Sequence, residues 1–399
     1  QSACLTLCKL SPCTESEICT PPYGLRTTHQ GSAEIIGFGI DLSKPLPAGE
    51  IVELYGSAIG VGKTKADCEA GLRAFGRVTH YNPDRLTAVS NNWGGGNKDR
   101  MLSDAFVRRE IEIGAAMHLD CVQIDDGWQR SGSFCGEWVT DEKKFPKGMA
   151  ATSEYVRDLG MTFGLWLAPL LLDDQSEYYE DLKHLSMPDI TLGEHYHPFN
   201  LGDPAYHDHL RKTFRRMVDE FGATYFKLDF LAAAVRYFNG KGHFVKFPDG
   251  YCIEVQRKAL QVIRETVGDD VFLLACGAQT LLGAGIFNGA RMSCDIIWGK
   301  NKAHPTYWQI MQNCLHTVGW RYFYHRKVYV NDPDGLVLRD WDRGDGFNCT
   351  WSEAQLWTVA IAMSGGSLLS NDELEKLSEP RRRLYVESLP PLGIPCRPV

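Results

Sequence analysis

From residue 86 onward, the sequence alternates between short apolar runs and segments with helical periodicity. Each run ends in polar residues or glycine before a helix pattern begins. The runs are Leu86–Trp93, Cys121–Asp126, Thr162–Pro169, Thr224–Asp229, Val271–Cys276, Ala290–Asp295, Val328–Asp332 and Ala360–Ser367. About eight strand–helix units over roughly 280 residues match the size of a (β/α)8 barrel. The sequence therefore predicts an α/β fold built on a TIM barrel.

Helix signals fill the segments between these runs. The clearest are Ser103–Met117, Ser153–Leu159, His207–Phe221 and Ile253–Thr266, and Ser103 is a typical N-cap residue. A doubly wound open sheet is the alternative α/β fold. It is disfavoured because no glycine-rich phosphate-binding loop follows any run in the Rossmann manner.

Residues 1–84 differ in character from the remainder of the chain. They contain Pro and Gly breaks and short β-prone pieces, among them Ala33–Ile40 and Ile51–Tyr55. We expect about two to four strands there, followed by a helix near Lys65–Tyr81. This is too little to close a β-sandwich, so we interpret it as a partial β-rich segment in front of the barrel.

Composition and charge narrow the classes of partner. The chain is 44% hydrophobic and 23% charged, as in ordinary globular proteins. A net charge of −8 without a Lys/Arg-rich run argues against nucleic acid or an anionic membrane as partner. The longest apolar stretch, Phe163–Leu172, is interrupted by Pro169 and is too short to span a bilayer. The first residues lack the features of a signal peptide, and the 13 cysteines leave the compartment open.

Polar and aromatic side chains collect where the apolar runs end. These residues are Trp93, Asp125, Asp126, Trp166, Lys227, Asp229, Cys276, Arg291, Asp295, Asn331 and Asp332. The active sites of TIM barrels lie at the carboxyl ends of the strands. This segregation is hard to obtain from packing needs alone and indicates an enzyme.

Asp229 and Asp295 are the candidate catalytic carboxylates, because they end the fourth and sixth runs and can face each other across a ligand. Lys227 lies two residues before Asp229, so both point the same way on a strand. Its ammonium would keep Asp229 ionised, as the nucleophile of a glycosidase must be. Asp295 would have to carry a proton, with burial or like charge offsetting Arg291. A structural Arg291–Asp295 ion pair is the alternative.

Asp125 and Asp126 form a second candidate site. Adjacent carboxylates at a strand end are costly unless they bind something. Ionised carboxylates accept strong hydrogen bonds from sugar hydroxyls, whereas a hard cation such as Ca²⁺ or Mg²⁺ is the alternative ligand. A helix-capping role could also explain one of the two. We expect a sugar, with neither a metal nor a cofactor.

Aromatic residues at or just beyond the strand ends suit the same ligand, because indole rings stack on the C–H faces of sugars. They are Trp93, Trp128, Trp166 and Trp298. Cys276 has no local base partner, so we interpret it as a pocket wall. The segment 331–334 (Asn-Asp-Pro-Asp) fits a calcium turn or, as we favour, a structural Asx–Pro turn.

Six motifs in order carry a family resemblance. They are Asp125-Asp126-Gly127-Trp128-Gln129, Gly164-Leu165-Trp166-Leu167-Ala168-Pro169, Lys227-Leu228-Asp229-Phe230, Arg291-Met292-Ser293-Cys294-Asp295, Asn331-Asp332-Pro333-Asp334 and Ser364-Gly365-Gly366. From about Leu86 to its end, the chain resembles glycoside hydrolase family 36. That family includes α-galactosidases, α-N-acetylgalactosaminidases and raffinose synthases.

The resemblance implies a retaining double displacement with Asp229 as nucleophile and Asp295 as acid/base. It places Lys227 and Arg291 beside these two carboxylates. Asp125 and Asp126 fall on the residues that take the 4- and 6-hydroxyls of a terminal galactose, and Trp93 and Trp166 fall on the aromatic wall. The implied partner is an α-galactoside carbohydrate, and a homo-oligomer is compatible with the sequence.

The resemblance also implies a division of the chain. Residues 1–84 would be a remnant of an N-terminal β-sandwich with a linking helix, and 85–380 the catalytic barrel. Residues 381–399 would be a tail leading to a β-domain missing from this chain. Two departures stand out: Leu228 occupies a position where Trp is frequent, and Gly277-Ala278-Gln279 replaces a Gly-rich stretch.

These departures leave the linkage and the specificity at C2 open. The α-N-acetylgalactosaminidases and the raffinose-synthase-like galactosyl transferases therefore remain alternatives within the family. A catalytically idle sugar-binding barrel is the alternative from a different functional class.

Overall fold

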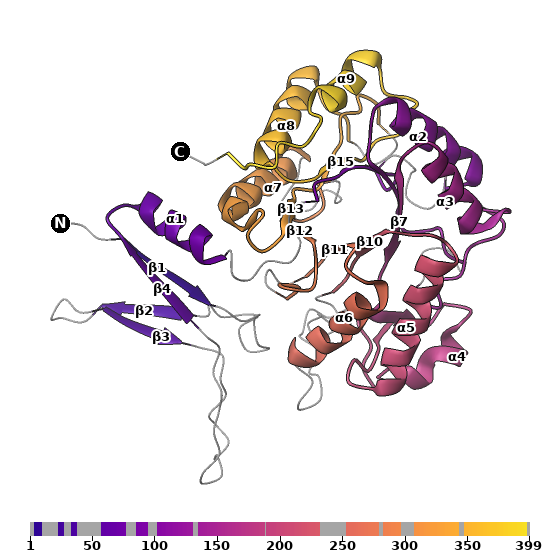
Figure 1. Ribbon diagram of the computed structural model, residues 1–399, viewed down its shortest axis with the longest axis horizontal. Helices are drawn as coiled ribbons and strands as arrows, with labels where there is room; N and C mark the ends of the chain where they lie inside the picture. Colours follow the sequence, from indigo (N-terminus) through magenta and orange to yellow (C-terminus); the bar gives the residue numbers. More distant parts are fainter. Residues whose placement is uncertain are drawn as a thin grey trace, which may run out of the picture.

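Strands and helices alternate through most of the chain from β5 onward in the computed structural model of the protein (Figure 1). The structure describes residues 4–9, 23–27, 33–37, 57–76, 85–94, 102–130, 135–187, 189–231, 253–278, 282–296, 307–342 and 347–396. The barrel strands are β5 (Ala88–Asn91), β6 (Cys121–Ile124), β7 (Thr162–Leu167), β10 (Tyr225–Leu228), β11 (Phe272–Ala275), β12 (Gly289–Arg291), β13 (Val330–Asp332), β14 (Gly335–Leu336) and β15 (Leu368–Ser370). The helices around them are α2 (Asp104–Ala116), α3 (Gly148–Asp158), α4 (Tyr179–Leu182), α5 (Pro204–Asp219), α6 (Ile253–Val267), α7 (Tyr307–Arg321), α8 (Trp351–Ser364) and α9 (Glu379–Glu387). Within connections lie β8 (Leu171–Asp173), β9 (Tyr196–Pro198) and the 3₁₀ helices η2 (Lys183–Leu185) and η3 (Tyr322–Tyr324).

The barrel strands form one parallel sheet that curls round on itself. Their order is β13-β12-β11-β10-β7-β6-β5-β15-β14. The two ends of this sheet, β13 and β14, are separated along the chain only by Pro333 and Asp334. They therefore act as one interrupted strand position, which gives the eight positions of a TIM barrel. The predicted α/β barrel fold is confirmed.

Apolar side chains fill the barrel interior. The ring of Tyr225 on β10 stacks on that of Phe272 on β11, with centroids 5.0 Å apart. Gly164 on β7 makes room for them, because a Cβ there would lie 2.9 Å from the Tyr225 side chain. Lys227 lies two residues beyond Tyr225 and points to the same side of the strand, nearer the carboxyl end. The register of β10 therefore places the charged Lys227 side chain over the stacked rings of Tyr225 and Phe272, on the side of the carboxyl ends of the strands.

The helix predicted from Ser103 onward is confirmed. The Ser103 hydroxyl accepts a hydrogen bond from the Phe106 backbone N–H at 3.2 Å and caps α2. Phe106 and Ile111 on this helix are buried in the layer between sheet and helices. The other predicted helices overlap α3, α5 and α6. This layer fixes the sheet and therefore the positions of the strand ends.

The predicted eighth strand, Ala360–Ser367, is wrong. Most of these residues belong to α8, which begins with a capping box between Thr350 and Glu353. Gly365, with φ 73°, ends the helix in a left-handed conformation, and β15 follows. The error has a physical reason: a short apolar run looks the same in a buried helix and in a buried strand.

The N-terminal part forms two small antiparallel sheets that lie to one side of the barrel (Figure 1). Its elements are β1 (Cys4–Lys9), β2 (Tyr23–Thr27), β3 (Ala33–Gly37), β4 (Ser57–Gly62) and α1 (Lys65–Gly76). The partial β-rich segment is therefore confirmed. The predicted strand Ile51–Tyr55 lies outside the described residues. The domain boundaries after residues 84 and 380 remain predictions.

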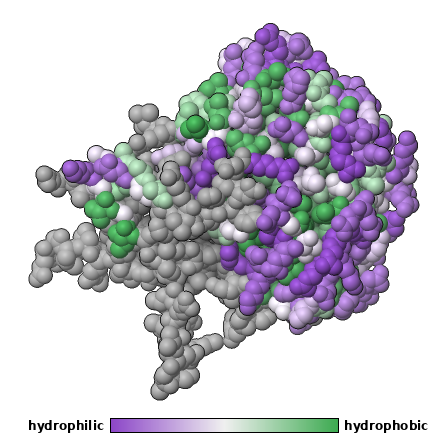
Figure 2. Space-filling model, viewed as in Figure 1, coloured by the Kyte–Doolittle hydropathy of each residue, from purple (hydrophilic) through white to green (hydrophobic). Residues whose placement is uncertain are grey.

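The visible surface is hydrophilic over much of α2, α3 and α5, with apolar areas elsewhere (Figure 2). On α8 the side chains of Leu356, Val359 and Met363 are exposed. No described helix combines the length and the apolar character that crossing a bilayer requires.

A buried carboxyl group links α2 to the segment after β15. Glu110 is 3% exposed, and its Oε1 accepts a hydrogen bond from the Leu374 backbone N–H at 3.0 Å. Burial raises the pKa of Glu110 to about 8, although the N–H groups of Leu374 and Glu375 favour the ionised form. The neighbouring carboxylates Glu373 and Asp372 raise it further.

This group makes folding depend on pH. The unfolded chain releases the Glu110 proton near pH ~4.3, whereas the folded protein holds it to about pH 8. The unfolded state therefore binds fewer protons in this window, and stability falls as pH rises, by at most about 1.4 kcal/mol per pH unit.

The unfolding free energy measured in urea between pH 5 and 8 should fall less steeply with pH for Glu110→Gln than for the wild type. The exposed Glu154→Gln is the control, and parallel slopes for wild type and Glu110→Gln would contradict this account.

Candidate active site

A cavity of about 220 Å³ lies at the carboxyl ends of the barrel strands. It is lined by Asn91, Trp93, Asp125, Asp126, Trp166, Lys227, Asp229, Phe230, Arg291, Asp295, Asp334, Leu369 and Asn371. These residues come from β5, β7, β10, β12 and β15 and from the segments that follow the barrel strands. The structure therefore brings most of the predicted site residues to one place.

Lys227 forms a buried ion pair with Asp125. Its Nζ lies 2.9 Å from Asp125 Oδ2, and the two side chains are only 7% and 3% exposed. The ion pair of Lys227 is therefore with Asp125, although the charge of Asp229 also acts on its ammonium. The long Lys227 side chain reaches from β10 to the end of β6, while Asp229 lies beyond the strand end and is held by other donors.

The pair fixes the charge of both groups. Burial opposes ionisation of Asp125, but Lys227 and the hydrogen bond from Asn91 Nδ2, at 2.6 Å, outweigh it and lower the pKa of Asp125. Burial likewise disfavours the ammonium of Lys227, yet the Asp125 charge raises the pKa of Lys227 above its ordinary value. The pair thus presents an ionised carboxylate at the floor of the cavity.

Neutral donors hold the Asp229 carboxylate. Its Oδ1 accepts the backbone N–H of Phe230 at 2.7 Å, and its Oδ2 accepts the indole N–H of Trp166 at 3.1 Å. Phe230 has φ 54°, a left-handed conformation that a bulky residue rarely adopts. Behind it lies Gly277, where a Cβ would come within 3.1 Å of Asp229 Oδ1. The backbone around Asp229 is shaped to present this carboxylate to the cavity.

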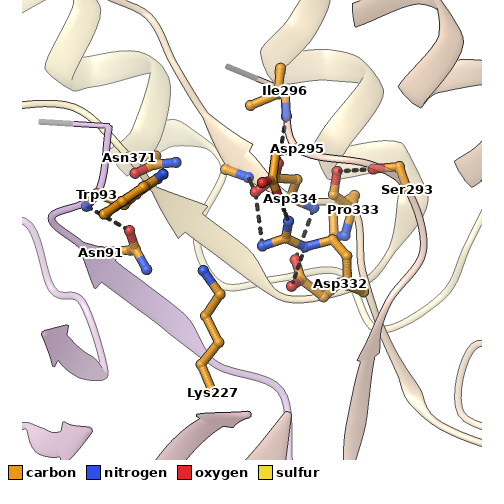
Figure 3. Close-up of polar contacts among 12 residues, drawn as sticks. Asn91, Trp93, Lys227, Ser293, Asp295, Ile296, Asp332, Pro333, Asp334 and Asn371 are labelled. Carbon is orange, nitrogen blue, oxygen red and sulfur yellow. Dashed lines mark hydrogen bonds and ion pairs between the residues drawn. The ribbon is translucent and has the colours of Figure 1, made fainter. Parts of the chain in front are cut away.

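Arg291 bridges three carboxylates on the opposite wall. Its Nη1 lies 2.8 Å from Asp295 Oδ1, its Nε lies 2.9 Å from Asp332 Oδ2, and its Nη2 lies 3.0 Å from Asp334 Oδ1 (Figure 3). The Asp295 side chain is 44% exposed, whereas those of Arg291, Asp332 and Asp334 are at most 5% exposed. The cluster therefore offers a single accessible carboxylate, that of Asp295.

The cluster holds more negative than positive charge. Burial raises the pKa of Asp334 to about 6, and the carboxylates of Asp295 and Asp332 add to the effect against the opposing charge of Arg291. The ion pair considered from the sequence between Arg291 and Asp295 is present, but within a larger network. A proton can therefore be held in this network near neutral pH.

The pair Asp125-Asp126 is arranged for hydrogen bonding. Asp126 Oδ1 accepts the side-chain N–H of Gln129 at 2.8 Å, and Asp126 lines the cavity. Lys227 already supplies positive charge at Asp125, where a hard cation would otherwise be needed. Among the described residues, no group of three or more His, Cys, Asp or Glu is placed to hold a metal ion.

Trp93 and Trp166 line the cavity, but Trp128 and Cys276 do not. Trp128 has 0% exposure, donates its indole N–H to the Trp166 carbonyl at 2.9 Å and packs on Trp138. Its proposed contact with a ligand is therefore wrong, because it supports Trp166 from behind. Cys276 is buried, and burial raises the pKa of its thiol. Trp298 lies outside the described residues.

Sequence reasoning missed five lining residues, which are Asn91, Phe230, Asp334, Leu369 and Asn371. Phe230 belongs to the motif that contains Asp229, and Asn91 lies two residues before Trp93 in the first apolar run, so their aromatic or polar character was a usable signal. Leu369 and Asn371 belong to the eighth strand and the residues after it, which the wrong strand assignment hid. Asp334 was interpreted only as part of a turn.

Comparisons with known proteins agree with this geometry. The family model described as Melibiase matches residues 78–237. An α-galactosidase of Escherichia coli is 30% identical over 132 residues, which are 31% of this chain and 19% of that protein. Alpha-galactosidase 2 of Pediococcus pentosaceus is 29% identical over 153 residues, which are 36% of this chain and 21% of that protein. The matched part thus spans about a fifth of the length of these curated relatives.

Solved structures share the fold. TtGalA, an α-galactosidase from Thermus thermophilus solved in complex with stachyose, superposes with a TM-score of 0.68 at 23% identity. The superposition covers 84% of this chain and 71% of TtGalA. The α-galactosidase AgaA from Geobacillus stearothermophilus gives a TM-score of 0.62 at 13% identity over 92% of this chain and 51% of AgaA. Family model, curated relatives and fold agree, and the chain resembles the α-galactosidases of glycoside hydrolase family 36, as its ordered motifs predict.

Proposed function

We propose that this protein is a retaining glycoside hydrolase that removes terminal α-linked galactose from oligosaccharides or glycoconjugates. The observation that carries the proposal is that Asp229 and Asp295, from the ends of the fourth and sixth barrel strands, line one cavity. Retaining glycosidases use two such carboxyl groups, one as nucleophile and one as acid and then base. The similarity to curated α-galactosidases supports galactose as the sugar.

The proposed reaction has two displacements. In the first, Asp295 gives a proton to the glycosidic oxygen, Asp229 bonds to the anomeric carbon, and the bond to the leaving group breaks. In the second, Asp295 takes a proton from water, the water oxygen bonds to the anomeric carbon, and Asp229 is released. Trp166 and the Phe230 backbone N–H orient Asp229 for both steps.

The proposed sugar site lies between the two carboxylates. Asp125 and Asp126 accept hydrogen bonds from sugar hydroxyls, and Lys227 keeps Asp125 ionised for this purpose. Trp93 and Trp166 supply aromatic wall on the same cavity. The cavity volume of about 220 Å³ is below the roughly 300–1,000 Å³ of pockets for drug-sized ligands, which suits a single sugar ring.

Asp229→Asn tests the nucleophile. Turnover of an aryl α-galactoside should fall by several orders of magnitude, because an amide cannot form the covalent intermediate. The matched control is Asp219→Asn on the exposed surface of α5, which should keep wild-type turnover. Wild-type turnover by Asp229→Asn would refute the assignment.

A substrate panel separates the alternatives. We expect the wild type to hydrolyse an aryl α-galactoside faster than its 2-acetamido analogue, and the reverse order would favour an α-N-acetylgalactosaminidase. Product analysis with sucrose as acceptor should show mainly free galactose, whereas a galactosylated sucrose would indicate a transferase. Galactose binding by calorimetry without turnover of any substrate would favour an idle sugar-binding barrel.

Lys227→Met tests the buried pair. The variant leaves the Asp125 charge buried without its partner, so we expect a loss of roughly 3–5 kcal/mol in unfolding free energy and weaker galactose binding. Adding Asp125→Asn removes the unpaired charge and should recover part of the stability but not the binding. Lys212→Met, at an exposed position of α5, serves as the control in the same urea titrations. An unchanged stability for Lys227→Met would show that the pair does not hold this part of the site.

A further inference from the structure

Asp334 occupies an unusual place in the barrel. It lies between β13 and β14, where the seventh strand position is interrupted, and its φ of 75° is left-handed. A non-glycine residue in this conformation is strained, and such strain is concentrated at functional sites. The Asp334 N–H donates to Asp332 Oδ1 at 2.9 Å, which stabilises the turn.

The side chain of Asp334 contacts the segment that carries Asp295 through two groups, the Ile296 backbone N–H and the Arg291 guanidinium. Asp334 Oδ2 accepts the backbone N–H of Ile296, the residue directly after Asp295, at 2.7 Å. Asp334 Oδ1 lies 3.0 Å from Arg291 Nη2, and Arg291 in turn donates to Asp295 Oδ1 at 2.8 Å. The backbone and the carboxylate of Asp295 are thus both tied to Asp334 (Figure 3).

Asp334 is itself firmly fixed. Its side chain is 5% exposed, and its Oδ1 also accepts the Gly335 backbone N–H at 2.7 Å. Because β12 pairs with β13, placing Arg291 beside Asp332, the contacts of Asp334 extend this pairing beyond the end of the strands. Asp295 itself is 44% exposed, and this network is what restrains it. A loosely held carboxylate would spend little time in line with a leaving group.

We propose that Asp334 is a positioning residue that holds Asp295 in place for proton transfer to the leaving group. The inference rests on the proposed function, since it takes Asp295 as the acid. It adds a role for a residue that neither touches the reacting atoms nor was expected from its turn motif to act in the site. The role acts through Arg291 and the Ile296 N–H.

Leaving groups of different basicity test this role. A basic alcohol needs protonation as it departs, whereas an activated nitrophenol needs little. Asp334→Asn places an amide between donors that require a carboxylate. We expect its kcat to fall roughly 10- to 100-fold on an α-galactosyl disaccharide, the scale of a misplacement of about 1 Å, but less than about threefold on a dinitrophenyl α-galactoside.

Two reference variants interpret the result. Asp295→Asn should show the same selectivity in stronger form. Asp372→Asn is the matched control, because Asp372 is also buried and accepts a backbone N–H, from Leu338 at 2.6 Å, but lies outside the cavity lining. It should change both substrates by the same factor. Equal losses on both substrates for Asp334→Asn, as for this control, would reduce Asp334 to a structural role and overturn the proposal.

A second variant covers the case in which Asp334→Asn fails to fold. Replacing Ile296 by its α-hydroxy acid deletes only the N–H that Asp334 holds and leaves every side chain intact. This variant should reproduce the selective loss of kcat on the disaccharide in milder form. If it shows no selective loss, the proposal is overturned. Failure of the proposed function is distinguishable, because a wild type inactive on both galactosides would show it before any variant is compared. A wild type that is active while Asp295→Asn lacks selectivity would refute the acid assignment and the inference together.

Discussion

The closure of one parallel sheet governs the rest of this structure. β15 pairs with both β5 and β14, while β14 follows β13 after two residues, so the first and last strands along the sheet meet. Parallel strands in a closed sheet place all their carboxyl ends at one mouth. Residues as distant in sequence as Asn91 and Asn371 therefore line the same cavity. No single strand end holds the site by itself.

The distribution of charge at this mouth follows from burial. Lys227 and Arg291, the two cations among the lining residues that the structure describes, are both engaged by carboxylates that share their burial. Lys227 serves Asp125, and Arg291 ties the exposed Asp295 to a buried pair of aspartates. Among the described residues that line the cavity, carboxylates then outnumber cations, which disfavours anionic ligands. The same excess suits a neutral polyhydroxyl ligand whose ring gains positive charge in the transition state.

The two candidate catalytic carboxylates, Asp229 and Asp295, lie in different surroundings. Asp229 accepts hydrogen bonds from two neutral N–H donors, on Trp166 and Phe230, and it is fixed by a strained backbone. Asp295 instead belongs to a network with more negative than positive charge. This difference in hydrogen-bond partners and surrounding charge is compatible with unequal roles for the two carboxyl groups in the proposed reaction.

Much of the architecture could be predicted from the sequence, because its signals are local. Strand–helix alternation and the cap at Ser103 gave the barrel and α2 correctly. The prediction of the eighth strand was wrong because the apolar run Ala360–Ser367 fits the periodicity of a buried helix as well as that of a buried strand. Gly365, which ends the helix, was interpreted only as part of a motif. The misplacement of the strand also concealed Asn371.

The candidate site was predictable as a set of residues but not as a set of contacts. The sequence predicted Lys227 and Asp229 on one side of a strand, but β10 ends at Leu228 and carries only Lys227. The sequence could not show that the ammonium reaches across to Asp125, since that depends on how β6, β7 and β10 lie side by side. The predicted ligand contact of Trp128 was wrong for a related reason. A strand-end position does not reveal whether a side chain faces the cavity or the layer behind it.

The central claim is that two carboxylates from separate strands act on one sugar at this mouth. A crystal structure of Asp229→Asn with a bound α-galactosyl disaccharide tests it most directly. The account predicts that the anomeric carbon lies about 3–3.5 Å from the side chain of residue 229. It also predicts the glycosidic oxygen within roughly 2.6–3.2 Å of the Asp295 carboxylate. A galactose bound away from either side chain, or with its anomeric carbon turned from residue 229, would contradict it.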